Sequence, residues 1–128
     1  MNVLIDTHVF LWLNEAPEKL SASALQLCER SDVRLYLSLV SVWEIQIKQQ
    51  LGKLSLTTPW QTMIQRQQQD NELKLLPIEL SHIEQLQTLP VVHRDPFDRL
   101  LIAQAIQSSM TIVTSDQFFS QYPVSIIS

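Results

Sequence analysis

Short apolar runs alternate with longer amphipathic segments along the chain. The apolar runs predict β-strands at residues 1–5, 35–39, 73–78, 111–114 and 124–127. The amphipathic segments predict helices at residues 7–13, 21–30, 41–51, 58–70, 81–86 and 95–108. Strands that alternate with such helices favour an α/β fold, a three-layer α/β/α sandwich over a mainly parallel central sheet. Because no repeat or low-complexity linker divides residues 1–128, we expect a single domain.

The ends of two predicted helices carry recognisable terminal residues. Asp95 is a good N-cap for the helix over 95–108, and Pro96 suits its first helical position. Ser41 and Glu44 have the spacing of a capping box, which predicts that the helix over 41–51 starts at Ser41. Gly52 suits the position just past the end of that helix.

Composition narrows the possible classes of function. With 45% hydrophobic and 17% charged residues, a chain of 128 residues can bury a core. Its one glycine excludes Walker and dinucleotide-binding loops, which need several glycines close to phosphate. Its one cysteine, Cys28, excludes a disulfide framework or a thiolate zinc site, and we expect it in the core. The net charge of −4 argues against coating nucleic acid by bulk charge, but allows local recognition of a phosphodiester.

The sequence predicts neither a membrane segment nor an export signal. No apolar run reaches the roughly 18 residues that a membrane span needs. The N-terminal segment lacks the basic region and the small-residue cleavage site of a signal peptide. We therefore expect a cytoplasmic protein without membrane association.

Four acidic residues stand where a parallel sheet would bring them together. Asp6 and Asp116 each follow an apolar strand, and Glu44 and Asp98 lie in the first turns of predicted helices. The carboxyl ends of parallel strands meet at one sheet edge, where α/β proteins bind ligands. Clustered carboxylates repel one another unless a cation joins them, and an all-oxygen site without Cys or convergent His suits Mg²⁺ or Mn²⁺. This set predicts metal-dependent hydrolysis of a phosphodiester.

Each acid also has a structural interpretation. Asp6 and Asp116 could cap the turns that follow them, and Glu44 could complete the capping box. Asp98 stands where an acid is favoured by the helix dipole. Four acids at one sheet edge are less easily explained as four caps. For a fifth acid, Asp95, we favour the capping role, although its spacing from Asp98 would let both side chains point into one cleft.

Four stretches that contain these acids resemble a known protein family. "LIDTHVFLW", "SVWEI", "HRDPFDRLLIAQA" and "IVTSD" occur in the order found in PIN-domain proteins. The chain is similar in particular to VapC-type toxins of bacterial toxin–antitoxin pairs. The resemblance spans the chain from Asp6 to Asp116, and its third stretch is the most specific. It implies a PIN-like α/β/α sandwich with a metal-dependent ribonuclease site.

The resemblance also implies roles for individual residues. The family's catalytic and metal-binding acids match four positions: Asp6, Glu44, Asp98 and Asp116. Polar residues beside the acids resemble those that support the metal in the family: Thr7, Ser41 and Thr114. Family members cleave RNA with Mg²⁺ or Mn²⁺, commonly form homodimers and are blocked by a cognate antitoxin. Gln117 and Phe118 stand where many members carry a further acid, so a fifth late ligand, which a second metal would use, is absent.

Basic residues flank the predicted site. We interpret His93 as a structural hydrogen-bonding residue, the more common role of a lone histidine. Arg94 and Arg99 could contact phosphate or pair with the carboxylates, and for Arg99 we expect an ion pair with a nearby acid. Lys48 and Lys53 could contact phosphate or remain solvated surface charges.

These observations favour a metal-dependent endoribonuclease that acts as the toxin of a toxin–antitoxin pair. Its expected partners are RNA, a cognate antitoxin and a second copy of the chain. Two alternatives remain. A PIN nuclease of RNA maturation, without an antitoxin, would have the same acids. A non-catalytic module could instead bind a basic partner helix, because an Arg that enters an acidic pocket gains charge-assisted hydrogen bonds.

Overall fold

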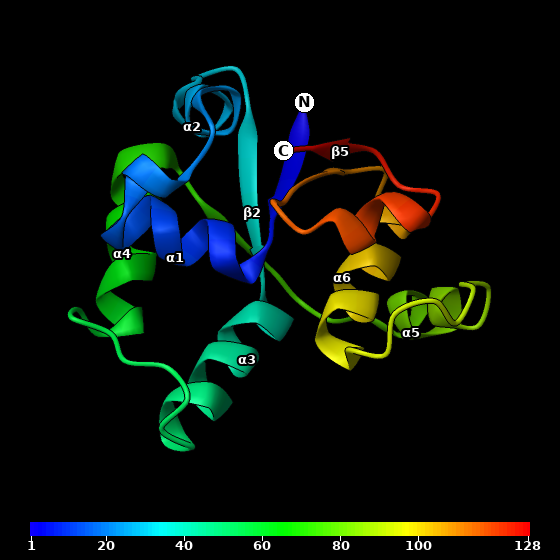
Figure 1. The fold of residues 1–128 in the computed structure, drawn as a ribbon. Coiled ribbons are helices and arrows are strands. Elements are labelled where there is room, and N and C mark those ends of the chain that lie inside the picture. The colour runs from blue at the N-terminus through cyan, green and yellow to red at the C-terminus, as the bar shows by residue number, and fades with distance from the viewer.

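A five-stranded sheet forms the centre of the computed structural model, which describes residues 1–128 (Figure 1). The strands lie in the order β3-β2-β1-β4-β5, and every neighbouring pair is parallel. They are β1 (Asn2–Ile5), β2 (Arg34–Ser38), β3 (Lys74–Leu76), β4 (Thr111–Val113) and β5 (Ile126–Ile127). The predicted α/β fold is confirmed, and the sheet is wholly rather than mainly parallel.

Helices cover both faces of the sheet and complete the three layers. The α-helices are α1 (Thr7–Glu15), α2 (Ala22–Glu29), α3 (Leu39–Gln50), α4 (Trp60–Asn71), α5 (Leu80–Leu86) and α6 (Pro96–Gln107). Helices α1, α2 and α4 lie on one face, α5 and α6 on the other, and α3 extends from the carboxyl edge (Figure 1). Two 3-10 helices, η1 (Pro17–Lys19) and η2 (Gln117–Gln121), were not predicted by the pattern. None of the helices is both long and apolar enough to cross a membrane.

The alternation of side chains along the strands divides the interior into two hydrophobic cores. Val3 and Ile5 belong to the core that α1, α2 and α4 cover, whereas Leu4 belongs to the core against α6. Cys28 is buried in the first core, as predicted. Because β1 is buried on both faces, its sequence is a continuous apolar run rather than an alternating one.

Helix α3 begins earlier than the sequence predicts. Its N-cap is Ser38, the last residue of β2, whose hydroxyl accepts a hydrogen bond from the Val40 N–H at 3.0 Å. Ser41 is therefore buried inside the helix, and the predicted capping box between Ser41 and Glu44 is wrong. The strand passes into the helix without a loop, so the cap comes from the strand's own last residue. At the other end, Gly52 has a φ of 72°, and its place just past the helix is confirmed.

The strand order places a topological switch point beside β1. The chain leaves β1 to form β2 on one side, whereas β4 pairs with its other side. The connections diverge at the carboxyl ends of β1 and β4, and open α/β sheets form their ligand crevices at such points. Asp6 and Asp116 lie just past these two strand ends.

Candidate functional site

One pocket at the carboxyl edge of the sheet brings the four predicted acids together. It has a volume of 260 Å³ and is lined by Asp6, Glu44, Asp98 and Asp116, with Asp95 beside them. The acids come from the ends of β1 and β4, the first turn of α6 and the second turn of α3. Residues separated by more than a hundred positions in the sequence therefore face one small volume.

Asp6 connects the first strand to the first helix. Its Oδ1 accepts the Val9 N–H at 2.7 Å, which caps α1, and its Oδ2 accepts the Thr114 hydroxyl. Burial raises the pKa of the Asp6 carboxyl, while these hydrogen bonds act in the opposite direction and the charge of Asp116 adds to the rise. The capping interpretation of Asp6 is confirmed, and the same side chain lines the pocket.

Thr114 links the ends of the two central strands. Its buried hydroxyl donates to Asp6 and accepts the Asp116 N–H at 3.0 Å. Asp116 Oδ1 accepts the Phe118 N–H at 2.9 Å and so caps η2. The Thr114 hydroxyl therefore binds the carboxylate of Asp6 and the backbone N–H of Asp116.

Glu44 is buried and has a partner for each carboxylate oxygen. Oε1 accepts the Thr7 hydroxyl at 2.6 Å, and Oε2 accepts the Lys48 ammonium at 2.5 Å. The Thr7 and Ser41 hydroxyls also share a hydrogen bond of 2.9 Å. Partial burial lowers the pKa of Lys48, but its hydrogen bond and ion pair with Glu44 outweigh this and raise the pKa overall. Lys48 therefore orients Glu44 rather than standing free as a surface charge.

Ionisation of the Asp98 carboxyl is disfavoured in the protein alone. The pKa of Asp98 is raised to about 6: burial is the largest cause, the hydrogen bond from His93 acts in the opposite direction, and the charges of Asp95 and Glu44 add to the rise. Asp95 is the N-cap of α6, because its Oδ1 accepts the N–H groups of Phe97 and Asp98 at 2.9 and 3.3 Å. The capping role predicted for Asp95 is thus confirmed.

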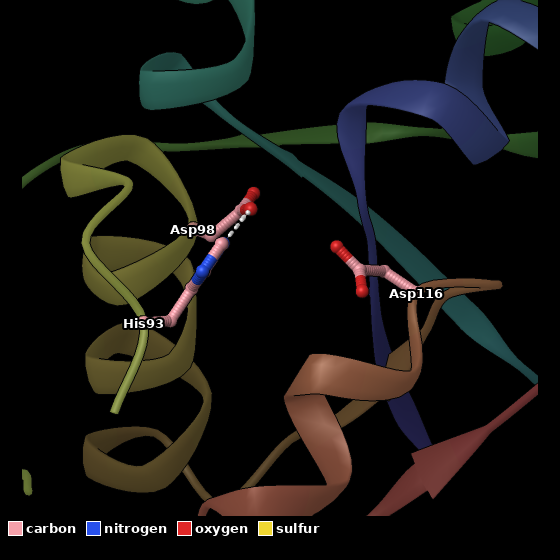
Figure 2. Close-up of side chains that lie close together, drawn as sticks. All are labelled: His93, Asp98 and Asp116. Atoms are coloured by element: carbon pink, nitrogen blue, oxygen red, sulfur yellow. Dashed lines mark hydrogen bonds and ion pairs between the residues drawn. The ribbon is translucent and has the colours of Figure 1, made fainter.

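His93 lies in the pocket beside the acids, a placement that the sequence did not reveal. Its Nε2 is 2.8 Å from Asp98 Oδ2, and Figure 2 shows both side chains facing Asp116. One ligand atom from each of these three residues lies within 4.8 Å of the others. The position depends on the loop that precedes α6, which has no periodic pattern to signal it.

The predicted arginines do not line the pocket. Arg94 is exposed, and Arg99 is half-buried with no ion pair and with no hydrogen-bond partner for its Nε. The ion pair expected for Arg99 is therefore wrong. Successive helical residues point about 100° apart, so a helix that turns Asp98 into the pocket turns Arg99 away from it. The carboxylate of Asp95, one turn earlier, is already used as the helix cap.

The donor set fits a divalent cation. Asp6, Glu44, Asp98 and Asp116 offer carboxylate oxygens, and His93 offers an imidazole nitrogen. The raised pKa of Asp98 shows that burial and like charges disfavour its anion in the protein alone. A cation bound among these groups would reverse that effect, because it favours the ionised carboxylates.

This combination of fold and acids has a match among known protein families. The PIN-domain profile matches residues 3–124. The chain belongs to the PIN-domain family. Within the family, Ribonuclease VapC22 of Mycobacterium tuberculosis is 30% identical over 116 residues, which covers 90% of this chain and 87% of the relative. The resemblance drawn from the four sequence stretches is therefore confirmed.

Solved structures with the same fold include toxin–antitoxin complexes. VapBC2 of Rickettsia felis, bound to a DNA fragment from its promoter, matches with a TM-score of 0.74 at 16% identity, over 99% of this chain and 98% of that chain. DNA-bound VapBC of Salmonella typhimurium matches with a TM-score of 0.67 at 14% identity, over 99% of this chain and 97% of that chain. At 14% and 16% identity, these two matches show a similarity of fold alone.

We predict that Asp98→Asn stabilises the metal-free protein at neutral pH. An acid whose pKa is raised on folding lowers stability as pH rises from its unfolded value, near 4, through its folded value, about 6. Asparagine removes that penalty, so the free energy of unfolding at pH 7 should increase by about 1 to 2 kcal/mol. Urea denaturation in EDTA at pH 4 and pH 7 measures the free energy of unfolding of the wild type and of Asp98→Asn. The difference between the two proteins should vanish at pH 4.

Asp70→Asn is the matched control, since Asp70 is exposed on α4 and outside the pocket. It should change stability by less than about 0.5 kcal/mol at either pH. A lower stability of Asp98→Asn than of the wild type in EDTA at pH 7 would contradict the prediction.

Proposed function

We propose that this PIN-domain protein is a metal-dependent endoribonuclease and the toxin of a toxin–antitoxin pair, acting in the cytoplasm as one domain. The observation that carries the proposal is the convergence of Asp6, Glu44, Asp98 and Asp116 at the switch point of the sheet. Family membership and the similarity to Ribonuclease VapC22 support RNA as the substrate.

In this proposal the four acids hold Mg²⁺ or Mn²⁺ and are the catalytic residues. The bound ion supplies Lewis-acid stabilisation of the negative charge that develops on phosphate during hydrolysis. Thr7 and Lys48 hold Glu44 by both of its oxygens, and Thr114 holds Asp6. The carboxylates are thus oriented before any ligand arrives, so little reorganisation is needed when the ion and substrate bind.

The distribution of charge supports an RNA substrate despite the acidic total. The chain has 13 acidic and 9 basic residues, and the excess of four equals the number of proposed metal-binding acids. A neighbouring groove of 360 Å³ shares Thr7 and Lys48 with the pocket and is also lined by Lys19 and Lys53. Lys48 is paired with Glu44, and Glu15 also lines the groove, so Lys19 and Lys53 supply the positive charge along this approach to the acids, where a phosphate backbone would be attracted.

The solved complexes of related fold support an antitoxin as the protein partner. They include the VapBC assemblies described above and a toxin–antitoxin complex of Klebsiella pneumoniae, which matches with a TM-score of 0.63. A basic antitoxin side chain that enters the acidic pocket would gain charge-assisted hydrogen bonds and would exclude the cation. The same contact would serve a non-catalytic binding module, so activity must be tested directly.

We expect the purified protein, freed of any partner, to cleave RNA with Mg²⁺ or Mn²⁺ and to stop in EDTA. Asp6→Asn combined with Asp98→Asn should reduce the cleavage rate at least about a hundredfold, because it removes two of the four anionic ligands. Cleavage of a labelled RNA measures the rate, and calorimetry measures binding of each metal.

Asp95→Asn is the matched control for this experiment, since asparagine caps a helix as well as aspartate does. Its rate should fall less than about tenfold. Activity that survives the double substitution would show that the site is assigned wrongly. Absence of metal binding at millimolar concentration would favour the non-catalytic module.

A toxin and an RNA-maturation nuclease differ in their effect on a host. Expression of the wild type in a host that lacks any partner should arrest growth, and the double variant Asp6→Asn with Asp98→Asn should not. Growth curves after induction, with equal protein amounts verified by immunoblot, measure the difference. Unimpaired growth with an enzyme that is active in vitro would favour the maturation nuclease.

An exposed apolar face on α3 and α6 supports the proposed homodimer. Leu39 and Trp43 lie one turn apart on α3, Trp43 is 57% exposed, and its ring packs edge-on against Phe97 of α6 at 5.5 Å. We predict that the wild type sediments as a dimer at micromolar concentration and that Trp43→Glu sediments as a monomer, because a charge would be buried at the interface. Leu51→Glu, an equally exposed position at the end of α3, should leave the dimer intact. A monomeric wild type would refute the dimer.

A further inference from the structure

The imidazole of His93 is positioned among the acids as a ligand would be. We propose that His93 Nε2 is a direct ligand of the cation in this site, beside Asp98 and Asp116, and that it shifts the preference of the site from Mg²⁺ towards Mn²⁺. This inference rests on the proposed function, because it takes a cation at the acids as given. It replaces the all-oxygen site that the sequence predicts with a mixed oxygen and nitrogen site.

The spacing of the three groups suits one shared ion. Nε2 of His93 is 2.8 Å from Asp98 Oδ2, and a carboxylate oxygen of Asp116 completes a group whose members all lie within 4.8 Å of one another. On cation binding the proton that Nε2 shares with Asp98 leaves to solvent, and the remaining ring proton stays on Nδ1, so that the Nε2 lone pair faces the ion. Ligands about 2.1 Å from a common ion are roughly 3 Å apart when adjacent and roughly 4.2 Å apart when opposite. In Figure 2 the imidazole and the two carboxylates point towards the space between α6 and the end of β4.

The histidine ring is held in this orientation from outside the cluster. It stacks on Phe118 with ring centroids 5.0 Å apart and an angle of 6° between the planes. Its backbone N–H donates to the hydroxyl of the buried Tyr122 at 2.8 Å. Phe118 and Tyr122 lie on and just after η2, the segment that Asp116 caps. The same segment therefore positions two of the three proposed ligands.

An imidazole ligand also limits the repulsion among the negative charges of the site. Each additional carboxylate increases the repulsion among the acids, whereas neutral imidazole adds a ligand without adding negative charge. Mg²⁺ demands hard oxygen ligands in near-ideal octahedral geometry and gives up water reluctantly. Replacing an oxygen by nitrogen therefore disfavours Mg²⁺ relative to first-row transition metals, among which Mn²⁺ still accepts a site rich in carboxylates.

The test uses Mn²⁺ bound to the whole protein labelled with ¹⁵N at histidine. Pulsed electron paramagnetic resonance detects a histidine nitrogen bonded to Mn²⁺ by its ¹⁵N hyperfine coupling, independently of activity. We expect the coupling in the wild type and its loss in His93→Gln. Calorimetry should show Mn²⁺ affinity reduced about tenfold or more in this variant and Mg²⁺ affinity reduced less than about threefold.

His8→Gln is the matched control, because His8 also lines the pocket but lies outside the three-residue group. It should keep the nitrogen coupling, and thermal melting should show that both variants fold. Bound Mn²⁺ without histidine coupling, or coupling that disappears with His8→Gln instead, overturns the assignment of His93 and leaves the proposed function standing. Failure of the wild type to bind either metal overturns the metal-dependent function itself, and this inference with it.

Discussion

The burial of several carboxylates close to one another is the constraint on which the site depends. Both Asp6 and Asp98 have a raised pKa, for which burial is the leading cause, and neighbouring acids add to the rise. Hydroxyl, ammonium and backbone N–H donors offset part of the free-energy cost of burying these charges. Thr114 donates to Asp6, and Lys48 donates to Glu44. The protein alone therefore carries a local instability that a bound cation would relieve, as is common where function requires like charges together.

A buried polar network sets the distance between the two helices that carry Glu44 and Asp98. Gln104 of α6 is fully buried, accepts the Ser38 hydroxyl at 2.6 Å and donates to the Pro77 carbonyl at 3.2 Å. Ser38 is also the N-cap of α3, so one hydrogen bond joins the start of α3 to the middle of α6. Because buried polar groups are costly to leave unpaired, this contact favours one relative position of the helices.

Features encoded by neighbouring residues were predictable, and those set by tertiary position were not. The apolar run before Asp6 and the Asp95–Pro96 pair predict a strand end and a helix start without reference to the rest of the chain. The N-cap of α3 was missed because Ser38 serves both strand and helix, and Ser41 offered a competing local pattern. The hydrogen-bonding role predicted for His93 is confirmed, but its place among the acids of the pocket was not predicted, because the path of the loop before α6 determines it. Helical phase, which the sequence does specify, explains why the ion pair expected for Arg99 does not form.

For Asp6 and Asp116, capping a helix does not exclude a place in the pocket, because each side chain does both. Asp116 uses Oδ1 for the Phe118 N–H, and this bond orients its carboxyl group within the three-residue cluster. Asp6 uses both oxygens, yet each carboxylate oxygen has a second lone pair that can still accept a cation. A capping bond fixes the rotamer of a side chain at a strand end, and at a switch point that rotamer faces the crevice. Capping is therefore how this fold aims Asp6 and Asp116 into the pocket.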